Sequence, residues 1–114
     1  MRTNFQFQNQ NITMVKGDTL SFNIEVFDEA GETITVDSAY MSCKEKPTSD
    51  EYIFQKSLLH GIRQEDGLIV VRVAPEDTEE VESGEYFYDV VIGVGQDRYT
   101  IMIGTLSLEQ NVTS

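Results

Sequence analysis

The chain has 114 residues, enough for one domain, and 39% of them are hydrophobic, enough for one packed core. Twenty acidic residues stand against eight basic ones, and this net charge of −12 argues against nucleic acid or an anionic membrane surface as a partner. The sequence has neither the apolar segment of a signal peptide nor an apolar run long enough to span a bilayer. We therefore expect a single domain over residues 1–114 that remains in the cytoplasm until a larger assembly carries it out.

The first part of the chain predicts short strands joined by turns. FQFQ at residues 5–8 alternates apolar and polar side chains, which predicts an edge strand inside an N-terminal arm formed by residues 1–11. A strand at 12–15 and a turn at 16–18 follow. Residues 19–27 then carry an apolar side chain at every second position, which is the clearest pattern of a half-buried strand in the chain.

Turn residues divide the middle of the chain into further strands. A turn at 28–32 contains a glycine that can supply positive φ, and a short strand or edge piece is expected at 32–36. Strands are also predicted at 38–44 and 52–58, on either side of a loop that contains a proline. The polar stretch 60–67 is interpreted as another loop.

The second half of the chain predicts a central strand, one helical turn and a long hairpin. The apolar run at 68–73 is bounded by turn signals, which predicts a buried strand. In segment 74–84, Pro75 suits a first helical position and acidic residues follow it, so we expect a single helical turn there. The order ends with strands at 85–92 and 99–108 and a polar tail at 109–114.

These elements predict an all-β fold, an immunoglobulin-like antiparallel β-sandwich of about 7–9 strands with one short helical turn. ESGEYFY, which contains Gly84, resembles the immunoglobulin-type corner, with Tyr86 at the tyrosine-corner position. Tyr88 stands where antibody domains have a disulfide-bonded cysteine. With one cysteine and no tryptophan, the chain lacks the disulfide core of those domains. The alternative is an ordinary β-turn that leads into an aromatic strand.

A longer pattern resembles small structural proteins of tailed bacteriophages and prophages. The likeness is greatest to the N-terminal immunoglobulin-like domain of phage baseplate upper proteins, and it spans about residues 12–113. It consists of a KGDT opening, a late G-x-Y-x-YD-V strand and a closing T-x-x-x-G strand that ends in V-T. The matching residues are Lys16, Gly17, Asp18 and Thr19; Gly84, Tyr86, Tyr88 and Asp89; Thr100 and Gly104; and Val112 with Thr113.

This resemblance implies a non-catalytic structural or assembly subunit of a phage or prophage tail or baseplate. Its partners would be other tail or baseplate proteins, or a second copy of the chain. It would reside in the bacterial cytoplasm before assembly and then in the virion. Baseplate upper proteins usually continue into a long helix and further domains, so we expect this extension to be absent or supplied by another chain.

The late hairpin carries apolar side chains on both faces. Its inward set is expected to be Tyr86, Tyr88, Val90 and Ile92, because these positions continue from the corner tyrosine. Phe87, Val91 and Met102 would then form an apolar patch on the outer face of one sheet. An exposed patch of this kind usually marks an interface. Two ways of covering it remain open: a partner, or the chain's own arm through Phe5 and Phe7.

No constellation of catalytic or metal-binding residues is visible, so we expect no enzyme activity, metal or cofactor. Cys43 is interpreted as a small buried hydrophobe, and His60 as a loop residue. The acidic runs are interpreted as solvated loops, because calcium-loop spacing is missing. The alternative to an assembly subunit is a carbohydrate- or receptor-binding adhesion module that uses loop tyrosines such as Tyr40, Tyr52 and Tyr99.

Overall fold

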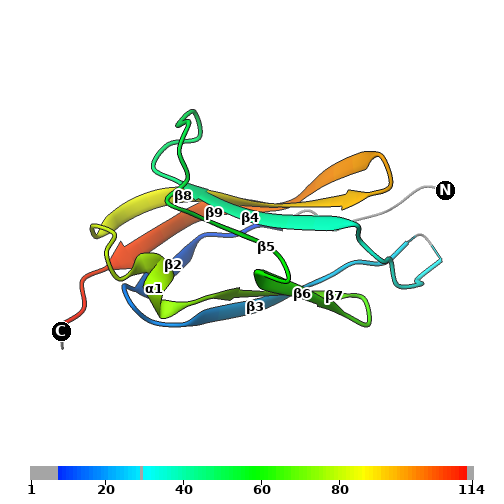
Figure 1. Cartoon of the computed structure of the whole chain (residues 1–114), viewed down its shortest axis with the longest axis horizontal. Coiled ribbons are helices and arrows are strands. Elements are labelled where there is room, and N and C mark those ends of the chain that lie inside the picture. Colours follow the sequence, from blue (N-terminus) through cyan, green and yellow to red (C-terminus); the bar gives the residue numbers. More distant parts are fainter. Residues whose placement is uncertain (1–7, 29, 113–114) are drawn as a thin grey trace.

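The computed structural model describes residues 8–28 and 30–112 and shows a nearly all-β domain (Figure 1). Its elements in chain order are β1 (Gln8–Asn9), β2 (Ile12–Val15), β3 (Leu20–Glu25), β4 (Ser38–Lys44), β5 (Phe54–Leu58), β6 (Gly61–Glu65), β7 (Leu68–Val73), α1 (Pro75–Thr78), β8 (Gly84–Val94) and β9 (Asp97–Glu109). The all-β prediction is therefore confirmed, and so is the single helical turn that begins at Pro75.

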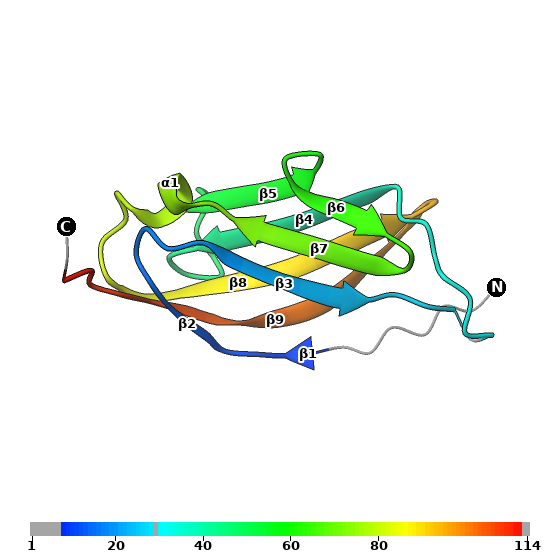
Figure 2. The ribbon, with the colours of Figure 1, turned by 90° about the horizontal axis from the view of Figure 1, so that it is seen from below.

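The strands form two layers, which are joined at one edge where β5 pairs with β6. Hydrogen bonds link them in the order β1–β9–β8–β4–β5–β6–β7–β3, with β2 also paired to β9. Only two residue pairs join β5 to β6, and the hydrogen-bonded path folds over there. Strands β6, β7 and β3 therefore form a small sheet, which lies below the large sheet of the other strands in Figure 1 and in front of it in Figure 2. This order is that of an immunoglobulin-like sandwich. Within the described ranges β3 pairs with neither β1 nor β2, so the sandwich is open along that side.

The N-terminal strands depart from the antiparallel pattern. Both β1 and β2 run parallel to β9, whereas β8 pairs with β9 and β4 in the antiparallel sense. The direction follows from connectivity. The chain leaves β2 through the turn at Gly17 and enters β3 in the other sheet, so β2 does not fold back on a neighbour as a hairpin would. These pairings, together with the short parallel contact between β5 and β6, make the sheet mixed.

The stretch predicted as a loop at 60–67 instead contains strand β6. It forms a hairpin with β7 through the two-residue turn Asp66–Gly67, in which both residues have positive φ (42° and 81°). Asp-Gly is a strong hairpin signal for this reason. Ile62 is 1% exposed and contributes to the core. The strand was not predicted because the stretch is mostly polar: only alternate residues of β6 face inward, and few of these are apolar.

Segment 32–36, predicted as a strand or edge piece, is held by backbone hydrogen bonds and by one side chain. A bridge pairs Phe27 with Thr33, and beside it the Ile34 N–H donates to the Val26 carbonyl at 3.3 Å. The Gln64 amide accepts a hydrogen bond from Val36 N at 3.0 Å and donates one to the Ile34 carbonyl. A side chain of β6 thus satisfies the backbone groups that a neighbouring strand would otherwise pair.

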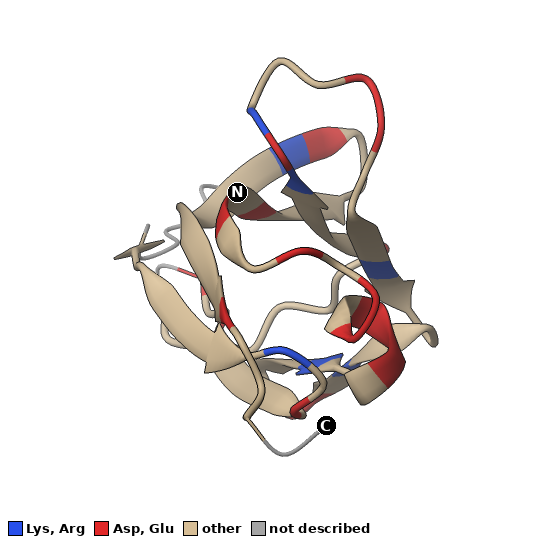
Figure 3. Cartoon of the chain, turned by 90° about the vertical axis from the view of Figure 1, so that its left-hand side faces the viewer, with Lys and Arg blue, Asp and Glu red and all other residues tan. Residues whose placement is uncertain are grey.

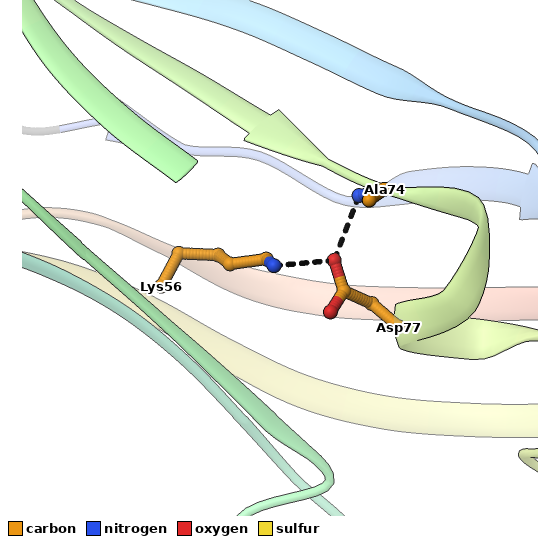
Figure 4. A network of polar contacts seen from close by, with 3 residues as sticks. All are labelled: Lys56, Ala74 and Asp77. Atoms are coloured by element: carbon orange, nitrogen blue, oxygen red, sulfur yellow. Dashed lines mark hydrogen bonds and ion pairs between the residues drawn. The ribbon is translucent and has the colours of Figure 1, made fainter. Parts of the chain in front are cut away.

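α1 connects the two sheets through a nearly buried ion pair (Figure 4). The Asp77 carboxylate accepts a hydrogen bond from Ala74 N at 2.7 Å, which caps the helical turn. The same oxygen lies 2.6 Å from Lys56 Nζ, which extends from β5, and the two side chains are only 15% and 16% exposed. The fully buried Thr78 hydroxyl accepts a further hydrogen bond from Gly17 N at 2.9 Å. This end of the sandwich is therefore fixed by polar contacts as well as by packing.

The core lies between the sheets and has no disulfide. Cys43 on β4 is fully buried opposite Tyr88 on β8, where it acts as the small hydrophobe that the sequence suggested. Burial raises its pKa to about 12, so the thiol stays protonated at neutral pH. The Tyr86 hydroxyl donates to the Glu82 carbonyl at 2.6 Å, which is the hydrogen bond of a tyrosine corner. Gly84 begins β8 directly before it.

Candidate functional site

The most distinctive surface is the outer face of β4, β8 and β9 in the large sheet, which we call the outer face. Strand register fixes which side chains point away from the core, because alternate residues face opposite sides. The resulting rows are Tyr40–Val91–Thr100, Ser42–Asp89–Ile103 and Lys44–Phe87–Thr105. Phe87, Val91 and Ile103 are the apolar members, and Ile103 is 37% exposed. The outer face thus mixes apolar and polar side chains around a central carboxylate.

A β-bulge in β9 changes which side chains face outward, so one of the predicted interface residues was wrong. Val90 pairs with Met102 and Val91 with Thr100, so Ile101 is an extra residue on β9. The side-chain alternation therefore reverses at this point. Met102, predicted on the outer face, is 4% exposed and lies in the core, while Ile103 takes its place on the outer face. The inward set of Tyr86, Tyr88, Val90 and Ile92 is buried as expected.

A groove of about 420 Å³ lies on the outer face. Phe87, Asp89 and Ile103 line it from β8 and β9, Lys44 from β4, and Pro47 from the loop between β4 and β5. Figure 1 shows this loop projecting above the layer of β4, β8 and β9. The volume is within the range of ordinary ligand pockets, and the combination of apolar lining with a few polar groups is also typical of them.

The N-terminal strand closes one side of the groove through an unusual contact. In a regular parallel ladder, Thr105 N would donate to the Gln10 carbonyl. Here that carbonyl accepts the Tyr88 hydroxyl at 2.6 Å instead, and Asn11 Oδ1 accepts from Thr105 N at 3.1 Å. The Gln10 carbonyl approaches so closely that a Cβ at position 104 would lie 1.9 Å from its oxygen, so Gly104 is required there.

Asp89 lines the groove and, among the described residues, has no close counterion. Burial is the main influence on its carboxyl group and raises its pKa, while Lys44 and Arg98 act in the opposite direction. Among the described residues, no Lys or Arg nitrogen lies within the 4.0 Å ion-pair limit of this carboxylate. The Lys44 ammonium lies 5.0 Å from the centre of the Tyr52 ring instead. Asp89 is thus a half-buried carboxylate that faces open space.

The remaining residues singled out by sequence do not converge on one site. Phe5 and Phe7 lie outside the described residues, so covering of the patch by the arm stays a prediction. Tyr40 is 41% exposed on β4, and Tyr52 is 50% exposed in the following loop. Tyr99 packs against the core instead. The groove itself was not predicted, because it depends on the bulge and on the contact between Gln10 and Gly104.

The rest of the described structure offers little other chemistry. No group of three or more His, Cys, Asp or Glu side chains within residues 8–28 and 30–112 could hold a metal ion. His60 is exposed at the turn between β5 and β6. Over the same ranges, no helix is long and apolar enough to cross a membrane. Seen from the end that carries α1, acidic positions along the ribbon are more prominent than basic ones (Figure 3).

Comparison with known proteins gives similarity to solved structures alone. No protein-family model matches the chain, and no curated protein is significantly similar to it. Among solved structures, the chain is similar to the N-terminal Ig1-2 module of the Drosophila receptor protein tyrosine phosphatase DLAR, with 14% sequence identity and a TM-score of 0.48. The match covers 100% of this chain and 52% of the other, so the chain spans about half the length of that structure. The immunoglobulin-like assignment rests on strand order and the tyrosine corner.

Proposed function

We propose that this domain is a non-catalytic assembly module that acts through protein–protein contacts made by the outer face. The observation that carries this proposal is the group of Phe87, Val91 and Ile103 beside a groove on a solvent-facing sheet. Each apolar side chain gains roughly 1.5–3 kcal/mol when it is fully transferred from water into an interface. Partial exposure in the free domain reduces this gain, yet the group still favours association.

We place this assembly in the tail or baseplate of a phage or prophage. The supporting features are the KGDT opening and the G-x-Y-x-YD-V strand, which resemble those of baseplate upper proteins. In the structure, the first motif lies in the turn between β2 and β3, and the second lies in β8, the middle strand of the outer face. On this proposal, the protein is cytoplasmic before assembly and part of the virion afterwards, with tail proteins as partners.

Co-expression with the proteins encoded beside its own gene tests the proposal. The tagged domain should co-purify with a neighbouring tail protein, and Phe87→Asp or Ile103→Asp should abolish this while leaving the domain folded by circular dichroism. Leu59→Asp is the matched control, because Leu59 is 89% exposed at the turn between β5 and β6 and lies outside the outer face. Co-purification that survives both outer-face variants would refute the assigned surface.

Carbohydrate binding is the second candidate, and the exposed Tyr40 and Tyr52 rings favour it. Aromatic rings beside polar groups suit sugar recognition because they present an apolar face together with hydrogen-bonding neighbours. A glycan array probed with the domain tests this function, with Tyr40→Ala and Tyr52→Ala as the loss-of-binding variants. A specific glycan signal without any protein partner would favour adhesion over assembly.

A further inference from the structure

Asp89 suggests what the partner must present to the groove. The carboxylate lies in the central row of the outer face, with Ile103 as its cross-strand neighbour and Phe87 two positions away on the same strand. Both apolar residues line the groove with it. A carboxylate in such surroundings loses part of its hydration, and a protein normally compensates by supplying an opposite charge. Within the described part of the chain, no ion pair does so.

The two basic residues that influence Asp89 are Lys44 and Arg98, and neither forms an ion pair with its carboxylate. Lys44 belongs to the adjacent row, and its ammonium lies over the Tyr52 ring. Arg98 is exposed near the start of β9, beyond the bulge. Both act on Asp89 from beyond ion-pair distance, so their compensation is partial, and the groove leaves room for a closer charge from a partner.

We propose that the groove binds an arginine side chain from a partner protein. A guanidinium can donate two parallel hydrogen bonds to one carboxylate, and its flat face stacks on aromatic rings. Asp89 and Phe87 supply these two surfaces side by side, and Ile103 provides apolar cover. The net charge of −12 favours a basic partner and disfavours a second copy of this chain. The inference rests on the proposed function and specifies the chemistry of its partner.

The probe is the tripeptide acetyl-Leu-Arg-Leu-amide, titrated into the ¹⁵N-labelled domain and followed by amide chemical shifts. Its matched control contains citrulline, which keeps the size and shape of arginine but has no charge. We expect shift changes at Phe87, Asp89 and Ile103, and about tenfold weaker binding of the citrulline peptide. Added salt should weaken the arginine peptide more than the citrulline peptide, because only one of the two is charged.

The variant Asp89→Asn should remove the preference for arginine over citrulline, whereas Glu25→Gln, on the outer face of the small sheet, should leave it intact. Equal binding of the two peptides, or shifts confined to the acidic end near α1, would overturn the proposal. Self-association in sedimentation experiments that depends on Phe87 would also overturn it, because the occupant would be a second copy. If the tripeptide fails while a neighbouring tail protein still requires Phe87, only this inference falls and the assembly function stands.

Discussion

The two sheets of the sandwich present very different outer faces to solvent. On the small sheet, Val70 has the central position but is only 6% exposed, and the exposed Asn23 and Arg63 lie opposite it on the neighbouring strands. Arg63 forms an ion pair with Glu65 at 3.2 Å, and both side chains are more than half exposed. On the large sheet, the central position is a carboxylate with apolar neighbours. One face resembles an ordinary solvated surface, and the other has its polar and apolar groups arranged around a groove.

This difference shows that alternation alone does not reveal the role of a sheet face. Both sheets bury every second residue, as a sandwich requires. What distinguishes the faces is how their charged side chains are placed. On the small sheet Arg63 and Glu65 pair with each other in solvent, whereas on the large sheet Asp89 lies between apolar side chains and, among the described residues, forms no ion pair. The first arrangement keeps a surface soluble, and the second favours contact with another molecule.

The largest effect is expected from Gly104→Val, which removes the contact that encloses the groove. The new Cβ would overlap the Gln10 carbonyl, so β1 must move and the hydrogen bond from Tyr88 must break. We expect a loss of about 3 kcal/mol of unfolding free energy, measured by urea denaturation. Hydrogen exchange should show lost protection near β1 and retained protection in β3 and β7. Thr105→Val, the adjacent outward-facing change, should alter stability by no more than about 0.5 kcal/mol.

The second prediction compares a nearly buried ion pair with an exposed one. Asp77→Ala leaves Lys56 without its counterion and α1 without its cap, so the free energy of unfolding should fall by about 2 kcal/mol. Arg63→Ala on the small-sheet outer face should have an effect close to zero, because that pair is exposed to solvent. Thermal and chemical denaturation of the two variants measure both values. Similar losses would show that the small-sheet outer face is more than a solvated surface.

The third prediction concerns the corner that anchors β8, the strand in the middle of the outer face. Tyr86→Phe removes the hydroxyl that donates to Glu82 and should lower the free energy of unfolding by about 1 kcal/mol. The ring stays in place, so the core should keep its packing. An unchanged denaturation midpoint would mean that the corner hydrogen bond contributes nothing to the position of β8.

Local sequence patterns predicted most of the strands, and the reasons for the misses are specific. The apolar alternation in residues 19–27 and the run at 68–73 directly reflect which side chains are buried, so both strands were found. Strand β6 was missed although Asp66–Gly67 carries a hairpin signal, because the polar residues around it outweighed that signal. The corner was predicted because its acid, glycine and tyrosine are close together in the sequence.

The candidate site was harder to predict because long-range contacts build it. A bulge depends on how two strands pair, so nothing within β9 alone indicates that Ile101 is the extra residue or that Met102 turns inward. The hydrogen bond between Tyr88 and Gln10 joins residues 78 positions apart. Phe87 and Val91 were placed on the outer face correctly because β8 alternates without interruption as far as Ile92. The groove follows only once these separate features are combined.

The smallest effect, and the most direct comparison of the two outer faces, comes from neutralising one carboxylate on each. Burial raises the pKa of Asp89, so the folded state binds its proton more tightly than the unfolded state does. The stability that this proton confers is fully present below the pKa of the unfolded state. It is lost as the pH rises through the raised pKa of the folded state. Ionised Asp89 therefore costs stability at neutral pH, and Asp89→Asn should raise the denaturation midpoint slightly.

This gain should shrink as the pH falls through the raised pKa and be absent below 3.8, the ordinary pKa of an aspartate, because the wild-type carboxyl group is then neutral in both states. Glu25→Gln provides the matched change on the small sheet, where the side chain is exposed, and we expect no comparable gain. Urea denaturation of both variants and the wild type across this pH range measures the difference. Equal behaviour of the two variants would mean that the groove imposes no cost on its central charge. A partner would then gain nothing by neutralising Asp89, and the contrast between the two faces would reduce to the apolar residues alone.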